Sequence, residues 1–421
     1  MGHYFDWNAE RKSVGLDELI NRAPQNDNID HKALRAYRQS RIRTEMAKHG
    51  MDAVVLCDGV NIRYATGTRN MQVWSGRNAP ARYLLLTQER SILFEFAGCA
   101  HLVIGFEDTI DEVRIARGAQ FNLDRNIEKK ERDWAKEMGD LIKELLGRDS
   151  GVTVGLERMN AGVGITMTEL GFKIVDAQVA VELAKSIKCS EKIQCIKESL
   201  RATERGVAML RDAIKPGQTE AELWSILHKA VIERDGDYVE TRLLNAGKRS
   251  VPWFQETSNA VIEENTLICL DTDVVGCHGY YSDFSRTFHA GPGEPSASQK
   301  QLYKDAYEML NYNISVLRPN MTFKEFADAA WVIPQKYWKH RYFAIAHGVG
   351  MTCEFPYLYS ARDFDEFGYD GIIEPGMTLS IEAYLSEERG TDGVKLEDQV
   401  LITETGIERL SQFPFEKALL S

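Results

Sequence analysis

One stretch of the chain, residues 268–288, concentrates carboxylates where an apolar strand gives way to a turn. The apolar run 267–270 leads into Asp271 and Asp273, whose spacing predicts that both carboxylates lie on one face of an extended strand. Two glycines then predict a turn, and a second strand-like run brings Asp283 back. Three close carboxylates would repel one another unless a divalent metal lay between them. The alternative at this point is that the aspartates are turn or edge residues with no ligand.

Three further residues change the balance between these two interpretations. His347 follows an apolar run, and Glu382 and Glu397 each interrupt another β-prone apolar run. Taken singly, each of the three is typical of a structural or solvated side chain. Taken together with the aspartates, they provide five carboxylates and one imidazole, which is enough to hold two metal ions with a bridging water.

The order of these residues resembles that of the pita-bread metalloenzymes, the family of methionine aminopeptidase, prolidase and creatinase. Within that family the sequence is most similar to the DddP-type dimethylsulfoniopropionate lyases. The resemblance covers most of residues 190–421 and, more loosely, residues 32–185. Besides the pair Asp271 and Asp273, it is carried by residues 240–244, 252–256, 374–379 and 395–403.

The resemblance implies an α/β (α+β) chain with two domains. Residues 1–185 would form a smaller creatinase-like α/β domain, and residues 186–421 a pita-bread catalytic domain. It also implies two divalent metal ions, iron by the closest resemblance and otherwise manganese, cobalt or zinc. Their expected ligands are Asp271, Asp273, Asp283, His347, Glu382 and Glu397. A homodimer in which the N-terminal domain covers the metal site is expected on the same grounds.

The resemblance further implies aromatic contacts to a small zwitterionic substrate. Trp74 and Tyr342 match the two aromatic residues that face the substrate in the DddP-type enzymes, and Trp253 is a third candidate. Such rings would hold a sulfonium or quaternary ammonium group by cation–π contact. By residue type alone, Trp74 is better explained as an ordinary core aromatic, and only the resemblance makes a substrate contact an equal alternative.

Two positions depart from the family pattern. Where the peptidases carry two further histidines, this chain has Trp253 and Cys353. Neither an indole nor a neutral thiol readily polarises a peptide carbonyl or protonates an amine, so peptidase activity is not expected. The DddP-type enzymes have an aspartate at the position of Cys353, where it is thought to act as the base. The expected base here is therefore Cys353 or Glu354, with a metal-bound hydroxide as a third possibility.

Composition narrows the class of protein. A chain of 421 residues exceeds the usual size of a single core, so two domains are expected. The net charge of -12 argues against nucleic acid and anionic membranes as partners. The seven cysteines form no Cys-x-x-Cys pair, and neither an apolar signal segment nor an 18-residue apolar run is present. The expected location is the cytoplasm.

Local patterns predict several elements of the N-terminal domain. Residues 31–49 and 126–147 read as amphipathic helices, and residues 52–57 as a buried strand. Residues 82–87 and 91–96 read as a β-hairpin, and residues 61–67 resemble a turn after the first strand of creatinase-type domains.

Three hypotheses about function follow. The first is a metal-dependent lyase that removes the proton next to a carboxylate and expels dimethyl sulfide. The second is a metal-dependent hydrolase of a small C–N substrate, similar to ectoine hydrolase, creatinase or an Xaa-Pro dipeptidase. The third is a non-catalytic binding protein, which a complete ligand set makes the weakest of the three.

Overall fold

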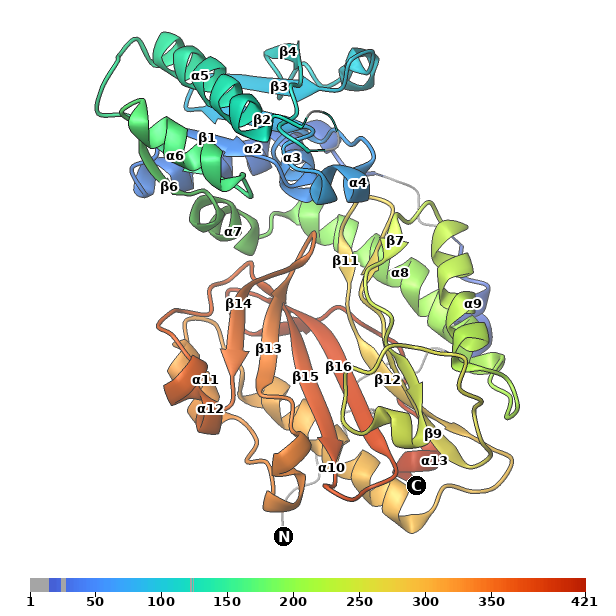
Figure 1. Cartoon of the computed structure of the whole chain (residues 1–421). Coiled ribbons are helices and arrows are strands. Elements are labelled where there is room, and N and C mark those ends of the chain that lie inside the picture. Colours follow the sequence, from blue (N-terminus) through green and yellow to red (C-terminus); the bar gives the residue numbers. More distant parts are fainter. Residues whose placement is uncertain (1–14, 24–27, 122, 124) are drawn as a thin grey trace. The chain divides into compact units, whose positions relative to one another are not determined.

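The computed structural model describes residues 15–23, 28–121, 123 and 125–421. The chain divides into two compact units, Ile29–Lys185 and Ser186–Ser421 together with Met1–Asn28 (Figure 1). The start of the chain therefore differs from the predicted 1–185 domain. Helix α1 (Leu16–Ile20) belongs to the C-terminal unit, because Leu19 is fully buried there and Arg22 pairs with Glu204 at 2.9 Å. Within the described residues, no helix combines the length and apolar character that crossing a bilayer requires.

The N-terminal unit is built on a six-stranded mixed sheet. Its spatial order is β4 (Glu112–Ile115), β3 (Ser91–Glu95), β2 (Tyr83–Thr87), β1 (Ala53–Leu56), β5 (Thr153–Leu156) and β6 (Lys173–Asp176). The helices of this unit are α2 (His31–Lys48), α3 (Gly59–Thr66), α4 (Gln72–Arg77), η1 (Ala100–Val103), α5 (Ile127–Leu146), α6 (Ala161–Glu169) and α7 (Gln178–Ser186). A hydrophobic cluster joins one face of the sheet to α5 and α6. This unit is the predicted creatinase-like α/β domain.

Most local predictions for this unit are confirmed, and one is wrong. Helices α2 and α5, strand β1 and the antiparallel β2–β3 hairpin form where the patterns place them. Residues 61–67, expected as a turn, instead form most of helix α3. The Asp58 carboxylate caps this helix by accepting from Val60 N at 2.8 Å, and Gly67 ends it with a φ of 85°. Asp58 before the segment and Gly67 after it are the sequence signals that predict a helix here rather than a turn.

The C-terminal unit holds three sheets. The first is β11 (Tyr281–Ser282), β10 (Val274–Val275) and β7 (Tyr238–Val239), and the second is β12 (Ser285–Ala290), β9 (Thr266–Asp271) and β8 (Leu244–Ala246). The third is β14 (Cys353–Tyr359), β13 (Ala344–Val349), β15 (Thr378–Ser386), β16 (Gly393–Ile402) and β17 (Ile407–Arg409). The remaining helices are α8 (Ser190–Asp212), α9 (Glu220–Ile232), η2 (Gly247–Ser250), α10 (Ala297–Val316), α11 (Phe323–Ala329), η3 (Gln335–His340), α12 (Ala361–Phe367) and α13 (Lys417–Leu420).

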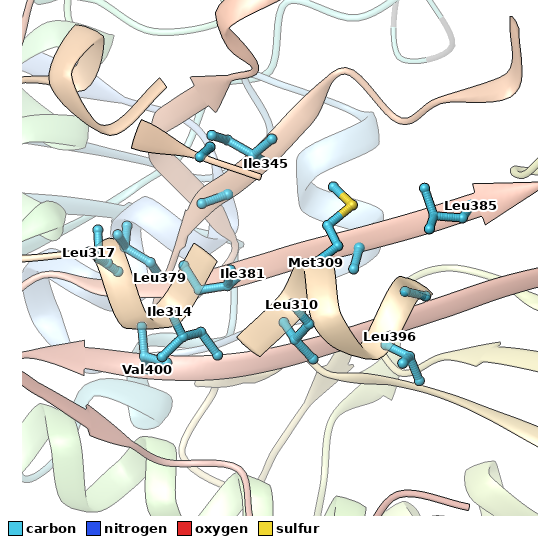
Figure 2. Close-up of a cluster of buried hydrophobic side chains, with 14 of the residues drawn as sticks. Met309, Leu310, Ile314, Leu317, Ile345, Leu379, Ile381, Leu385, Leu396 and Val400 are labelled. Atoms are coloured by element: carbon cyan, nitrogen blue, oxygen red, sulfur yellow. The ribbon is translucent and has the colours of Figure 1, made fainter. Parts of the chain in front are cut away.

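Strands β15 and β16 separate the hydrophobic core from the polar centre of this unit. Side chains alternate between the two faces of a strand. Leu379 and Ile381 on β15, with Leu396 on β16, face the core formed with α10 (Figure 2). The alternate positions carry Glu382 and Glu397, which are directly opposite each other in the β15–β16 ladder. The same two strands therefore anchor the core on one face and present buried carboxylates on the other.

A buried arginine joins the two sheets behind these carboxylates. Arg286 on β12 pairs with Asp398 on β16 at 2.8 Å, and neither side chain is exposed. The same guanidinium donates to the carbonyl oxygens of Glu397 at 2.7 Å and Phe413 at 2.6 Å. Asp398 also accepts from Arg409 at 3.0 Å and from Ser411 at 2.9 Å, so the buried Arg286–Asp398 pair is the centre of a network that holds β12 against β16.

We expect Arg286→Met to destabilise the C-terminal unit by about 3–5 kcal/mol, because the buried Asp398 would lose one of its arginine partners and the carbonyl oxygens of Glu397 and Phe413 would lose a donor. Denaturant unfolding followed by tryptophan fluorescence would measure the loss. The matched control is Lys324→Met, since Lys324 is half-exposed and pairs with Asp328 one turn along α11. That change should alter stability by less than about 0.5 kcal/mol. A loss as small as this in Arg286→Met would contradict the role assigned to the pair.

Candidate metal centre

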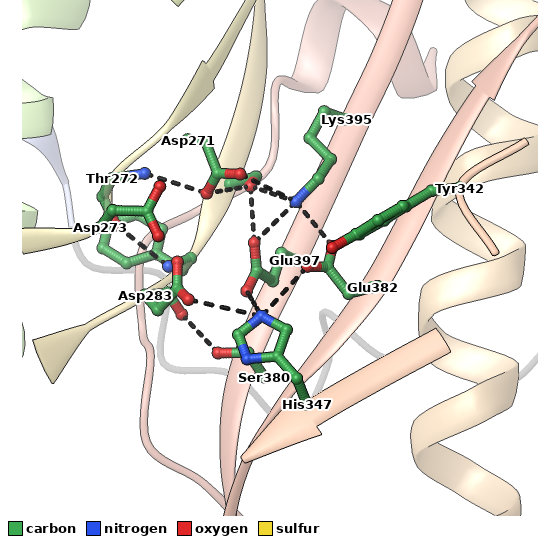
Figure 3. Close-up of polar contacts among 12 residues, drawn as sticks. Asp271, Thr272, Asp273, Asp283, Tyr342, His347, Ser380, Glu382, Lys395 and Glu397 are labelled. Carbon is green, nitrogen blue, oxygen red and sulfur yellow. Dashed lines mark hydrogen bonds and ion pairs between the residues drawn. The ribbon is translucent and has the colours of Figure 1, made fainter. Parts of the chain in front are cut away.

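Five of the six predicted ligands converge in two overlapping groups. One group contains Asp271, Asp273 and Asp283, and the other contains Asp283, His347 and Glu397. In each group the potential ligand atoms lie within 4.8 Å of one another, and Asp283 belongs to both (Figure 3). Asp283 therefore connects the two candidate ligand groups.

The aspartates converge by a different route from the predicted one. Asp271 ends β9, whereas Asp273 lies between β9 and β10 with a φ of 39°, in the left-handed region. The two residues therefore do not share one face of a continuous strand. The chain turns at this point, and β9 and β10 enter separate sheets. The turn in the backbone, rather than the two-residue period, brings the carboxylates together.

The remaining predicted ligands come from the central strands of the five-stranded sheet. His347 lies on β13, with its Nε2 atom 3.5 Å from Asp283 Oδ2 and 3.3 Å from Glu382 Oε1. Its distance to Glu397 Oε1 is 3.8 Å. The imidazole therefore points one nitrogen at three carboxylates, and Glu382 stands beside both groups as the sixth member of the set.

Lys395 is a member of the centre that the sequence analysis missed. Its ammonium group lies 2.6 Å from Glu382, 2.8 Å from Glu397 and 3.2 Å from Asp271, and its side chain is fully buried (Figure 3). Lys395 precedes Glu397 by two positions on β16, so both side chains lie on the same face. The two-residue spacing between Lys395 and Glu397 is the sequence signal from which the position of the lysine could have been predicted. The lysine neutralises part of the carboxylate charge from within the protein.

A serine hydroxyl completes the polar network around this lysine. Lys395 donates to Ser285 Oγ at 2.9 Å. The same oxygen lies 2.8 Å from Asp271 Oδ1 and 2.7 Å from Glu397 Oε2. Ser285 begins β12, so it connects the strand after Asp283 with the strand that carries Glu397. This network fixes the inner oxygens of the carboxylates.

The charges of the centre are only partly balanced by the protein. Burial, together with the charge of Asp271, raises the pKa of Asp273 to about 7. Burial also raises the pKa of Glu397 to about 8 and that of Asp283 well above its ordinary range. Burial acts in the same direction on Asp271, but the nearby Lys395 ammonium lowers the pKa of that carboxyl. Further positive charge would therefore stabilise the ionised carboxylates.

The donor atoms fit a divalent metal. Asp283 Oδ1 and Glu397 Oε1 are buried, and neither accepts a hydrogen bond from any described residue. Buried carboxylate oxygens without partners are costly unless a cation binds them. A set of carboxylate oxygens with one imidazole nitrogen suits borderline first-row ions such as iron, manganese, cobalt and zinc. The predicted ligands could hold such an ion here.

The two candidate bases have different surroundings. Cys353 is exposed at the start of β14, and its Sγ atom lies 3.3 Å from His347 Nδ1, the ring nitrogen that does not face the carboxylates. Glu354 is buried, pairs with Lys188 at 3.1 Å and accepts from Met351 N at 2.7 Å. The thiol is therefore accessible, whereas the Glu354 carboxylate is engaged in holding its own loop.

The candidate aromatic contacts also differ from one another. Tyr342 is part-buried, with its ring centre 5.9 Å from Lys395 Nζ, and its hydroxyl lies 2.9 Å from that of Tyr357. Trp253 is only 7% exposed and packs in a small core with Tyr384, behind Tyr342. Trp74 lies on α4 of the N-terminal unit, 43% exposed, with its ring edge-on to Phe96. The roles of all three in substrate binding stay predictions.

Removing Lys395 should destabilise the metal-free protein more than the metal-loaded protein. In Lys395→Met, three buried carboxylates lose their ammonium partner, and we expect the Tm of chelator-treated protein to fall by roughly 6–20 °C. Added divalent metal should reduce this difference, because the ion supplies positive charge to the same carboxylates.

Differential scanning calorimetry with and without metal would measure both effects. The matched control is Lys197→Met, since Lys197 forms a half-exposed pair with Glu408 in the same unit. That variant should keep its Tm in both states. An equal loss of Tm with and without metal in Lys395→Met would show that the lysine acts through packing alone.

Comparisons with known proteins identify the family of this chain. Residues 194–404 match the family model described as metallopeptidase family M24, and residues 38–170 match the creatinase/prolidase N-terminal domain. The chain is 33% identical over 404 residues to dimethylsulfoniopropionate lyase DddP of Roseobacter denitrificans, covering 93% of this chain and 88% of the relative. The corresponding protein of Roseovarius nubinhibens is 31% identical over 399 residues, with the same coverage.

Solved structures support the fold. An Xaa-Pro dipeptidase from Bacillus anthracis aligns with a TM-score of 0.73 at 21% identity, covering 91% of this chain and 99% of that one. A prolidase from Pyrococcus horikoshii aligns with a TM-score of 0.69, also at 21% identity, covering 90% and 99%. With the family matches and the geometry of the centre, the conclusion is that this chain belongs to metallopeptidase family M24, with a creatinase/prolidase N-terminal domain followed by a pita-bread domain.

Proposed function

We propose that this protein is a metal-dependent lyase that cleaves dimethylsulfoniopropionate, or a similar small zwitterionic carboxylate, to dimethyl sulfide and acrylate. The observation that carries the proposal is an aromatic ring, Tyr342, beside an acidic metal centre. This combination suits a molecule with a carboxylate at one end and a cation at the other. The two dimethylsulfoniopropionate lyases among the relatives, at 33% and 31% identity over 93% of the chain, support the same substrate class.

The charge of the centre favours two divalent ions. Five carboxylates face one buried ammonium group, so four negative charges lack a partner within the protein when the imidazole is neutral. Two divalent ions carry the charge that would balance them. Iron is the choice that the resemblance suggests, and the ligand set also accepts manganese, cobalt or zinc. When bound, the ions would supply Lewis acidity that holds the substrate carboxylate and stabilises the charge developing on it.

The chain would supply the base and the surface that binds the cation. As a thiolate, Cys353 takes the proton from the carbon next to the carboxylate, the bond between the neighbouring carbon and sulfur breaks, and its electron pair leaves with dimethyl sulfide. The C–H electrons form the double bond of acrylate, and the proton stays on the base. We place Cys353 in this role rather than Glu354 because its thiol is exposed, whereas Glu354 is buried against Lys188.

A hydrolase of a small C–N substrate is the second candidate. It is supported by the similarity of this chain to other relatives that are named as peptidases or dipeptidases. One of them is the Xaa-Pro dipeptidase of Pyrococcus furiosus, which is 27% identical over 57% of this chain. The residues at the two positions where the peptidases carry histidines weigh against it. One is Trp253, which is buried in a small core, and the other is Cys353.

We expect Asp283→Ala to lose metal and activity together, because Asp283 is common to both ligand groups. Elemental analysis of the purified variant would measure the metal content per chain. The matched control is Asp328→Ala on α11, a half-exposed aspartate that pairs with Lys324 one turn earlier on the same helix. It should keep its full metal content. A full complement of metal in Asp283→Ala would show that the ligand assignment is wrong.

Cys353→Ser should keep its metal and lose about 10²-fold or more in the rate of dimethyl sulfide release, because a serine hydroxyl is too weakly acidic to ionise and act as the base near neutral pH. Cys353→Asp restores the residue of the DddP-type enzymes and should preserve or raise the rate. Gas chromatography of the released sulfide, with acrylate measured in parallel, gives the readout. Cys277→Ser, a change at a part-buried cysteine of the same unit, is the control and should leave the rate unchanged.

Two other outcomes would change the interpretation. If neither Cys353 variant alters turnover, the thiol is only a packing residue and the base lies elsewhere. If the wild type releases no sulfide while Cys353→Asp does, the natural substrate is a different small zwitterion, and the hydrolase becomes the better candidate. Amine release from ectoine and from an Xaa-Pro dipeptide would then be measured.

A further inference from the structure

Two adjacent aromatic residues occupy opposite environments near the metal centre. Trp253 is 7% exposed in a small core with Leu243, Cys269 and Tyr384. Phe254, the next residue, is 57% exposed. Trp253 was predicted as a substrate contact from the resemblance, whereas Phe254 was not. Of these two residues, Phe254 is the one whose ring a substrate can reach.

The backbone at Phe254 is held in an unfavourable conformation. Its φ is 72°, in the left-handed region that residues with a large side chain rarely adopt. This conformation directs Trp253 into the core while its neighbour remains outside. The ring also remains largely in water, so burial does not compensate for the backbone strain. Strain of this kind at an exposed aromatic residue is a feature of ligand-binding sites.

The Phe254 ring extends an aromatic surface that begins at a metal-ligand candidate. His347 is stacked on Tyr357 with ring centres 5.5 Å apart, and the Tyr357 hydroxyl lies 2.9 Å from that of Tyr342. Tyr342 meets Phe254 edge-on, with ring centres 5.3 Å apart and an interplanar angle of 79°. The surface therefore runs from the carboxylate cluster outward to an exposed ring.

Two of the aromatic rings near the centre, those of Trp253 and Tyr342, already lie beside a cation of the protein. Lys395 Nζ lies 5.9 Å from the ring centres of both Trp253 and Tyr342. A second cation, brought by a substrate, needs an aromatic face that is exposed and lies farther from the lysine. Phe254 offers such a face next to Tyr342. The net negative charge of the nearby carboxylates favours a cation in the same region.

We propose that Phe254, together with Tyr342, forms the binding surface for the onium group of a small zwitterionic carboxylate and determines the preference for a carboxylate that carries an onium group over one that carries an uncharged alkyl group in its place. The proposal rests on the proposed function for its substrate class, since the carboxylate end is assigned to the metal centre. Phe254 would then determine specificity without taking part in the proton transfer.

The test uses a matched pair of ligands that differ only in charge. The probes are 3-(trimethylammonio)propanoate and its carbon isostere 4,4-dimethylpentanoate, bound to the metal-loaded full-length protein and measured by isothermal titration calorimetry. Phe254→Leu keeps an apolar side chain and removes the aromatic face. We expect it to weaken the cationic probe about fivefold and to change the neutral isostere less than about twofold.

Two further variants make the result specific. Phe254→Trp should bind the cationic probe at least as tightly as the wild type, because indole is the strongest cation–π partner. Phe367→Leu changes an aromatic residue that is 46% exposed and contacts Phe343 and Tyr359, and it should change neither affinity. Equal losses for both probes in Phe254→Leu, or no loss for either, would overturn the proposal.

Failure of this inference can be told apart from failure of the proposed function. The calorimetry needs no turnover, whereas the lyase reaction is tested by sulfide release. If Phe254→Leu selectively weakens the cationic probe while the wild type releases no dimethyl sulfide, the onium surface is supported and the lyase assignment is wrong. If the wild type releases sulfide while Phe254→Leu binds both probes normally, the lyase assignment is supported and the role of Phe254 is wrong.

Discussion

The C-terminal unit depends on the electrostatics of a group of buried carboxylates. Bringing the buried Asp271, Asp283, Glu382 and Glu397 together with the part-buried Asp273 is unfavourable unless positive charge is supplied. The protein supplies one charge of its own through Lys395, which contacts three of the five. The remaining excess of negative charge makes the centre a strong attractor for divalent cations. Burial, together with this imbalance, raises several of these carboxyl pKa values above their ordinary range.

The period of two in β-strands connects this centre to the stability of the fold. On β15 and β16, one set of alternate residues packs against α10 in the core, and the other set carries ligands and the lysine. A ligand on such a strand has little freedom to move without disturbing the core behind it. The buried Arg286–Asp398 pair adds a second restraint by joining β12 to β16. Groups held in this way keep the fixed geometry that metal binding and catalysis require.

Chemistry within this fold is determined at the edge of the metal centre rather than by its ligands. The solved dipeptidases and prolidases share the fold at about one-fifth identity, which carries no information about substrate. Around the ligands, this chain places aromatic rings and a thiol: Tyr342 beside the lysine, Phe254 outside it and Cys353 behind His347. Aromatic surfaces favour a cationic group, and they lack the donors that stabilise a cleaving amide. The proposed onium substrate follows from these surroundings.

The sequence by itself determined the family, the α/β class and the six candidate ligands, because the order of acidic residues and apolar strands is a local pattern. Helices α2 and α5 and the β2–β3 hairpin were predictable for the same reason. Three features were decided only by the tertiary structure. The left-handed turn at Asp273 depends on β9 and β10 entering different sheets, and Lys395 gains its role from carboxylates on two other strands. The opposite burial of Trp253 and Phe254 depends on a core that neighbouring residues in the sequence do not reveal, since burial is set by contacts between distant segments.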